Sequence, residues 1–229
     1  MEFLNFLQVR GILNKLTPEK FEKLINDVLS VGLDSSTLLK GVIVLIFEKA
    51  LDEPKYSSMY AQLCKFLVEK APNFDPPESN ACTFKRLLLK KCKDEFENRV
   101  QIAQEYEKSS ATNELEEDSK YMAKRKMLGN IKFMGELGKL EIVHDTILHR
   151  CCEQLLVGRR KQPIPDQAED LECLCHLMKT CGRILDTPVA KVTKIIQPPP
   201  KSQITRVEFF VKTQCPILKD RFSGFFVKS

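Results

Sequence analysis

The chain has 229 residues, of which 43% are hydrophobic and 29% charged, a composition typical of a globular protein and unlike a disordered or collagen-like chain. Its longest apolar run, Val42 to Phe47, is far shorter than the roughly 18 residues that span a membrane. From Arg183 onward the chain carries nine basic and three acidic residues, against 27 basic and 28 acidic before it, so the body itself is charge-balanced and gives no reason to expect nucleic-acid binding.

Helical periodicity dominates the first third of the chain. Thr17 and Pro18 predict a helix start, and one apolar stripe follows at Phe21, Leu24, Ile25, Val28 and Leu29. The next helix is expected from Asp34–Ser36 to Pro54. Its apolar residues cover most of its circumference, which predicts packing on several sides.

The same spacing predicts helices along most of the remaining chain, at residues 56–70, 82–108, up to about Leu137, 141–157 and 166–181, with 187–196 also compatible with one. Three segments interrupt the pattern: turn-rich 72–79, acidic 113–119, expected to be an insertion, and the basic, proline-punctuated loop 159–165. Period-two alternation is not evident before Ile204. We therefore predict an all-α protein, an α-solenoid of antiparallel helix hairpins.

Catalytic and metal-binding patterns are weak. Gly138-Lys139 lacks the upstream glycine and the following Ser/Thr of a phosphate loop, and no Gly-x-Ser-x-Gly occurs. Several residues of the C-terminal half could gather on neighbouring helices but lack zinc spacing: Cys151, Cys152, Cys173, Cys175, His176 and Cys181. Of these, Cys151, Cys175 and Cys181 fall on apolar stripes. We predict core packing and free thiols, without a catalytic residue, metal or cofactor.

Nine cysteines and a start without a basic leader or cleavage site favour a soluble, cytoplasmic protein. Several charged or polar residues stand at expected turns and helix ends, among them Asn14, Lys15, Glu48, Lys49, Glu53 and Arg86. In a solenoid such turns align into a docking surface, but the residues alone favour the simpler interpretation that each is a solvated polar or charged side chain.

Seven blocks of sequence resemble the middle domain of the eukaryotic translation initiation factor 4 gamma family, in its order and spacing. They are Gly11–Phe21, Leu39–Leu51, Glu53–Cys64, Phe84–Leu89, Asp94–Glu97, Met127–Leu137 and Asp170–Cys175. Gly135–Leu140, with Gly138 where the main branch has Phe, is more similar to the death-associated protein 5 branch. None of Tyr56, Tyr60, Tyr106 or Tyr121 is followed five residues later by Leu, as the cap-binding-subunit peptide requires, which agrees with that branch.

The resemblance implies HEAT-type hairpins, about four pairs recognisable here. It assigns 1–8 to a divergent N-terminus, 9–186 to the MIF4G-type domain and 187–229 to a divergent basic tail, where Pro198–Pro200 predict an altered or missing fifth hairpin.

The implied function is a monomeric, non-enzymatic scaffold for cap-independent translation that docks the DEAD-box RNA helicase initiation factor 4A, with contacts to initiation factor 3 and mRNA. The resemblance places the helicase contacts among Asn14, Lys15, Glu48, Lys49, Glu53, Pro54 and Arg86. Two alternatives stay open: an RNA-binding module acting through Arg159, Arg160 and Lys161, or a truncated, weakly active variant.

Overall fold

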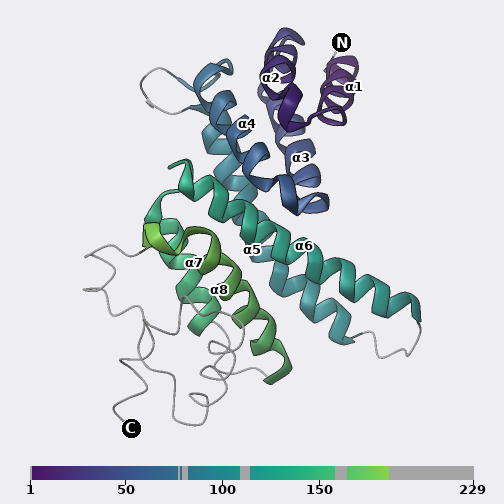
Figure 1. The fold of residues 1–229 in the computed structure, drawn as a ribbon, viewed down its shortest axis with the longest axis vertical. Helices are drawn as coiled ribbons and strands as arrows, with labels where there is room; N and C mark the ends of the chain where they lie inside the picture. The colour runs from purple at the N-terminus through teal and green to yellow at the C-terminus, as the bar shows by residue number, and fades with distance from the viewer. Residues whose placement is uncertain (1, 77, 79–81, 109–113, 158–163, 186–229) are drawn as a thin grey trace. The chain divides into compact units, whose positions relative to one another are not determined.

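The computed structural model describes residues 2–76, 78, 82–108, 114–157 and 164–185, in two compact units, Met1–Ile142 and Val143–Ser229 (Figure 1). The described part is helical, without strands, which confirms the all-α prediction. The first unit contains α1 (Glu2–Leu13), η1 (Pro18–Lys20), α2 (Phe21–Ser30), α3 (Ser36–Asp52), η2 (Pro54–Tyr56), α4 (Ser57–Lys70), α5 (Thr83–Lys108) and α6 (Glu114–Lys139). None of the helices in the described ranges is long and apolar enough to cross a membrane.

Helix α3 is the centre of the first unit and packs against α1, α4, α5 and α6. Ser35 caps its start by accepting a hydrogen bond from the Leu38 N–H at 3.0 Å. Nine of its 17 residues are buried, as the predicted all-round packing requires: Leu38, Leu39, Val42, Ile43, Leu45, Ile46, Phe47, Ala50 and Leu51. The Phe47 ring meets Phe133 of α6 edge-to-face, with centroids 5.1 Å apart, which joins α3 and α6 in one core.

Helix α1 was not predicted, because its apolar residues lie on all sides and leave no helical period to detect. It is held by Val9 and Leu13, which are fully buried, and by Asn5, whose side-chain amide donates to the Gly32 carbonyl at 3.2 Å. A Cβ added at Gly41 would lie 3.0 Å from the Phe6 ring, so this glycine lets α1 approach α3 closely.

Several helix boundaries differ from the sequence prediction, among them the starts of α6 and α7. The acidic residues of 113–119 were expected to form an insertion, but α6 already begins at Glu114, where acidic side chains at a helix N-terminus are favoured by the helix dipole. After α6, Glu141 adopts a left-handed conformation with φ 60°, and α7 begins only at Asp145 rather than at 141. Figure 1 shows α5 and α6 side by side as a long hairpin.

The second unit contains α7 (Asp145–Val157) and α8 (Ile164–Leu185), which pack on each other. Helix α8 runs past the predicted end at 181, through a residue of non-helical conformation, Cys181 at φ −132°. Pro165 stands in its first turn, where a missing N–H costs nothing. The expected helix 187–196, the altered fifth hairpin and the tail lie outside the described residues.

Candidate functional site

The turn between α3 and α4 holds Glu53 and Pro54 in a fixed geometry. Glu53 follows the last residue of α3, its N–H bonds to the Lys49 carbonyl at 2.9 Å, and Pro54 opens η2. The Lys49 ammonium lies 3.5 Å from one Glu53 carboxylate oxygen, and the Tyr60 hydroxyl donates to the other at 2.8 Å. Tyr60 is fully buried, and burial together with this hydrogen bond raises its pKa, so the hydroxyl stays protonated.

A hydrogen bond from Arg125 of α6 also stabilises the turn between α3 and α4. Arg125 donates through its guanidinium to the Asp52 carbonyl at 2.9 Å, satisfying a carbonyl that the end of α3 leaves without an intrahelical partner. One turn later, a Cβ added at Gly129 would lie 3.3 Å from Leu51 backbone atoms, so α6 crosses the end of α3 at close contact. Contacts from α3, α4 and α6 therefore all stabilise this turn.

Asn14 and Lys15 follow the last residue of α1. Both are exposed, and their N–H groups bond to the Arg10 and Ile12 carbonyls at 3.0 Å. Short connections on either side of α2 make α1 and α3 run parallel. The Phe6 ring of α1 lies beside Gly41 of α3. Because both helices rise by the same distance per residue, Asn14 and Lys49, each eight residues further on, are at a similar height along the two helix axes. We call the surface formed by Asn14, Lys15, Glu48, Lys49, Glu53 and Pro54 the α3–α4 edge.

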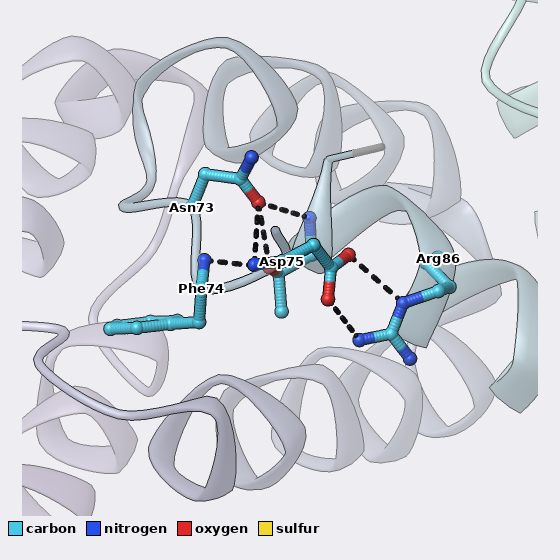
Figure 2. A network of polar contacts seen from close by, with 5 residues as sticks. Asn73, Phe74, Asp75 and Arg86 are labelled. Atoms are coloured by element: carbon cyan, nitrogen blue, oxygen red, sulfur yellow. Dashed lines mark hydrogen bonds and ion pairs between the residues drawn. The ribbon is translucent and has the colours of Figure 1, made fainter. Parts of the chain in front are cut away.

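Arg86 lies apart from this edge, beyond the other end of α4. Its Nε and Nη2 donate to the two Asp75 carboxylate oxygens at 3.0 and 2.6 Å (Figure 2). This pairing lowers the pKa of Asp75 and raises that of Arg86. Since α4 has 14 residues and rises about 1.5 Å per residue, its two ends are roughly 20 Å apart. The structure thus groups Glu48, Lys49, Glu53 and Pro54 at the end of α3 and places Arg86 at the far end of α4, while Asn14 and Lys15 follow the end of α1, which packs on α3.

The loop beside Arg86 is ordered by a second set of bonds. The Asn73 side-chain oxygen accepts from the Thr83 hydroxyl at 2.7 Å and the Thr83 N–H at 3.0 Å, while the Thr83 hydroxyl accepts from the Phe74 N–H at 2.8 Å (Figure 2). Thr83 is fully buried. We call Asn73, Asp75, Thr83 and Arg86 the loop clamp; it leaves the Phe74 ring 41% exposed.

Comparison of the chain with known proteins identifies its family. The family model described as the MIF4G domain matches residues 6–219. The chain belongs to the MIF4G domain family. It is 54% identical over 196 residues to eukaryotic translation initiation factor 4 gamma 2 of Mus musculus and of Homo sapiens, a match covering 81% of this chain and 21% of each relative. It is 40% identical over 200 residues to eukaryotic translation initiation factor 4 gamma 3 of Mus musculus, covering 81% and 12%.

The solved MIF4G domain of Trypanosoma cruzi translation initiation factor EIF4G5 superposes with a TM-score of 0.62 at 20% identity, covering 91% of this chain and 94% of that one. This likeness confirms the predicted α-solenoid fold. The chain spans about a fifth of the length of the factor 4 gamma 2 relatives. The MIF4G match runs past residue 186, while the domain boundary there stays a prediction.

The cysteines of this MIF4G domain behave as predicted for core residues. Cys151, Cys173, Cys175 and Cys181 are buried, and burial raises the pKa of the Cys152 thiol. Thiols of this kind are poor nucleophiles and poor metal ligands at neutral pH. Within the described ranges, three or more His, Cys, Asp or Glu side chains do not gather into a cluster that could hold a metal ion.

Sequence reasoning missed three residues that shape the site. Tyr60 and Arg125 act through contacts with Glu53 and Asp52, and the Asp75 partner of Arg86 is 11 residues away in sequence. Arg125 is 73 residues from Asp52, so no local pattern signals that contact. The predicted RNA contacts Arg159, Arg160 and Lys161 lie outside the described residues.

Proposed function

We propose that this MIF4G domain is a non-enzymatic scaffold in translation initiation that docks the DEAD-box RNA helicase initiation factor 4A and supports cap-independent translation. The observation that carries the proposal is the 54% identity to translation initiation factor 4 gamma 2 over 196 residues, against 40% to factor 4 gamma 3, both within a MIF4G match. This difference favours the death-associated protein 5 branch, in which the scaffold acts without the cap-binding subunit.

The α3–α4 edge supports docking because its exposed polar groups stand on a braced turn. Asn14, Lys15 and Glu48 are exposed, whereas Lys49, Glu53 and Pro54 are half-buried and held by the contacts to Tyr60 and the α3 end. We assign the first three residues to contact with the helicase and the other three to maintaining the surface. A surface ordered before binding loses less conformational entropy when the partner arrives.

The scaffold acts on the helicase by holding its two lobes in a poised arrangement, while ATP hydrolysis stays with the helicase. Such an effect requires that the scaffold bind the poised arrangement more tightly than the open one. Arg86 and the loop clamp, at the far end of α4, give a second region for contact on the same unit. Initiation factor 3, mRNA and RNA contacts at Arg159, Arg160 and Lys161 belong to the same proposal.

Charge reversal on the α3–α4 edge tests helicase docking. The variant Lys15→Glu with Glu48→Lys changes two exposed side chains and keeps the net charge. We expect the purified variant to bind initiation factor 4A at least about tenfold more weakly than the parent in calorimetric titration, equal to about 1.4 kcal/mol, and to lose stimulation of the helicase ATPase.

A matched control reverses two exposed charges elsewhere on the unit, Lys23→Glu on α2 with Glu69→Lys on α4. It should bind and stimulate like the parent. Equal weakening by both variants would locate binding away from the edge, and a folded parent that does not bind the helicase would refute the docking proposal. RNA affinity that falls with salt and disappears on neutralising Arg159, Arg160 and Lys161 would support the RNA-binding alternative instead.

A further inference from the structure

Helix α6 exposes two large apolar side chains in its first half. Tyr121 is 66% and Met122 is 43% exposed, whereas the apolar residues in its second half are buried: Ile131, Phe133, Met134 and Leu137. We call Tyr121 and Met122 the α6 pair. A single exposed apolar residue is ordinary on a protein surface. What distinguishes this pair is its position beside the α3–α4 edge.

The side of α6 that packs on α3 continues past the end of α3. Gly129 meets the last turn of α3, and Arg125, one turn earlier on α6, donates to the carbonyl of Asp52, the last residue of α3. Met122 is seven residues before Gly129, almost two full turns, so its Cβ leaves α6 within about 20° of the same direction. Tyr121 is four residues before Arg125 and is its neighbour on the helix surface. The pair therefore occupies the part of this side that α3 is too short to cover.

Exposed charged side chains connect the α6 pair to the α3–α4 edge. Glu48 and Asp52, one turn apart on α3, are exposed, and so are Arg125 and Lys126 on α6. The η2 helix of that edge also packs against α6. An apolar centre beside a charged rim is the usual anatomy of a protein–protein interface.

We propose that the α6 pair is the apolar anchor of the helicase-docking surface: the Tyr121 ring and the Met122 thioether enter an apolar depression of the partner, and the α3–α4 edge forms the polar rim. This inference rests on the proposed docking of initiation factor 4A at that edge. The edge residues assigned to contact, Asn14, Lys15 and Glu48, are polar, and polar rim contacts contribute little affinity. Interface affinity is concentrated in a few desolvated side chains, among which tyrosine is enriched.

The size of the α6 pair favours a partner that also covers the edge. From the exposed fractions, the two side chains present roughly 200 Å² of surface, whereas stable interfaces bury about 1,200 Å² or more in total. Two copies of the chain that met through the pair alone would bury roughly 400 Å², the size of a crystal-packing contact. A partner on the α3–α4 edge extends to the pair across Asp52 and Arg125 and gains an apolar centre for its contact.

Calorimetric titration of the purified chain with initiation factor 4A tests the role of the pair. The double variant Tyr121→Ala, Met122→Ala removes both exposed side chains and keeps a high helix propensity, and circular dichroism checks its helix content. We expect it to bind about 10- to 100-fold more weakly than the parent. Tyr121→Phe keeps the aromatic ring and should bind within about twofold of the parent, because the anchor acts through apolar burial.

The matched control is Phe3→Ala with Leu4→Ala, which removes two exposed apolar side chains from α1. It should bind the helicase like the parent. Equal weakening by this control and by the α6 double variant would overturn the proposal, because the loss would then follow from removing any exposed apolar pair.

An α6 double variant that binds like the parent would also overturn the proposal, and the Lys15→Glu, Glu48→Lys variant reports separately whether docking at the edge holds. A folded parent that does not bind the helicase refutes the docking itself and the role of the pair with it. If the parent forms a dimer in sedimentation velocity that the α6 double variant loses, while both bind the helicase equally, the pair belongs to a contact between two copies instead.

Discussion

The two ends of α4 are held by polar contacts of the same kind in different surroundings. At the α3–α4 edge, the Glu53 carboxylate accepts from Tyr60, which is fully buried, and Arg125 and Gly129 of α6 close the turn. At the loop clamp, Asp75 pairs with an Arg86 side chain that is 53% exposed. A buried hydrogen bond contributes to the free energy of unfolding, whereas an exposed ion pair contributes little and mainly fixes the shape of a surface. The comparison separates residues that hold the fold from residues that order a loop.

The close crossing of α6 over the end of α3 gives the largest expected effect. Gly129→Val places side-chain atoms where a Cβ alone would already lie 3.3 Å from the Leu51 Cα and carbonyl oxygen. Because these are backbone atoms, α6 must shift away, and we expect a loss of about 2–4 kcal/mol in the free energy of unfolding. Urea denaturation measures this change.

Gly11→Val is the matched control, since Gly11 also lies in a helix and a Cβ there meets nothing within 4 Å. It should leave the stability within about 0.5 kcal/mol of the parent, because valine has a slightly better helix propensity than glycine. Similar losses in both variants would show that helix propensity, and not the crossing, controls the result.

The Tyr60 hydroxyl gives the next effect. Tyr60→Phe removes its hydrogen bond to Glu53, and we expect a loss of about 1–2 kcal/mol near neutral pH. The raised pKa of Tyr60 also makes stability depend on pH. Above about pH 10 the unfolded tyrosine loses its proton while the folded one keeps it, so stability falls as pH rises further.

The difference in melting temperature between the parent and Tyr60→Phe should therefore shrink between about pH 8 and about pH 10.5. Buried cysteines with raised pKa values, such as Cys64, add the same pH trend to both proteins and cancel in this difference. Tyr121→Phe, at an exposed position, should match the parent throughout. A pH-independent difference would show that Tyr60 has no raised pKa.

The fold was largely predictable because most helices bury one stripe at helical spacing. Helix α2 follows this rule: Leu24, Ile25 and Val28 of its predicted stripe are buried, while Phe21 and Leu29 are half-buried. Helix α3 was predicted as packed on several sides, and its nine buried residues agree with that prediction. Helix α1 was missed for the opposite reason: with apolar residues all round, it shows no periodicity although it is a helix. The start of α6 was missed because an acidic run describes a helix N-terminus as well as a loop.

The candidate site was only partly predictable. Position at a turn indicated Glu53 and Arg86, but the contacts that order the turn depend on tertiary packing. Tyr60 of α4 donates to Glu53, and Arg125, 73 residues from Asp52 in sequence, donates to the Asp52 carbonyl next to Glu53. Nothing in the residue types shows that Arg86 is separated from Glu53 by the length of α4. The contacts that decide a residue's role are long-range, and sequence periodicity reports only on local geometry.

The loop clamp gives a smaller effect that appears in a pKa rather than in stability. Its cause is the hydrogen bond from Arg86, which lowers the pKa of Asp75. In Arg86→Gln the Asp75 pKa should rise toward its ordinary value. The parent loses this contribution to stability as pH falls through the lowered pKa, and the variant should lack that acid dependence. Titration of the Asp75 carboxyl carbon by NMR measures the change.

Lys90→Gln is the control, because Lys90 is exposed one turn further along α5. It should leave the Asp75 pKa unchanged. The Phe74 amide should stay protected from hydrogen exchange in Arg86→Gln, since its bond to the Thr83 hydroxyl does not involve the guanidinium. Loss of that protection would show that the ion pair, and not the Asn73–Thr83 bonds, orders the loop.

Lys49→Gln gives the smallest effect and tests which Glu53 contact matters. The pair has an N···O distance of 3.5 Å, one helical turn apart and partly exposed, so its loss should cost no more than about 0.5 kcal/mol in urea denaturation. Glu53 keeps the buried Tyr60 hydroxyl as its partner. If Lys49→Gln cost as much as Tyr60→Phe, the ion pair would stabilise Glu53 as strongly as the Tyr60 hydrogen bond, and the α3–α4 edge would depend on surface charge in the same way as the loop clamp.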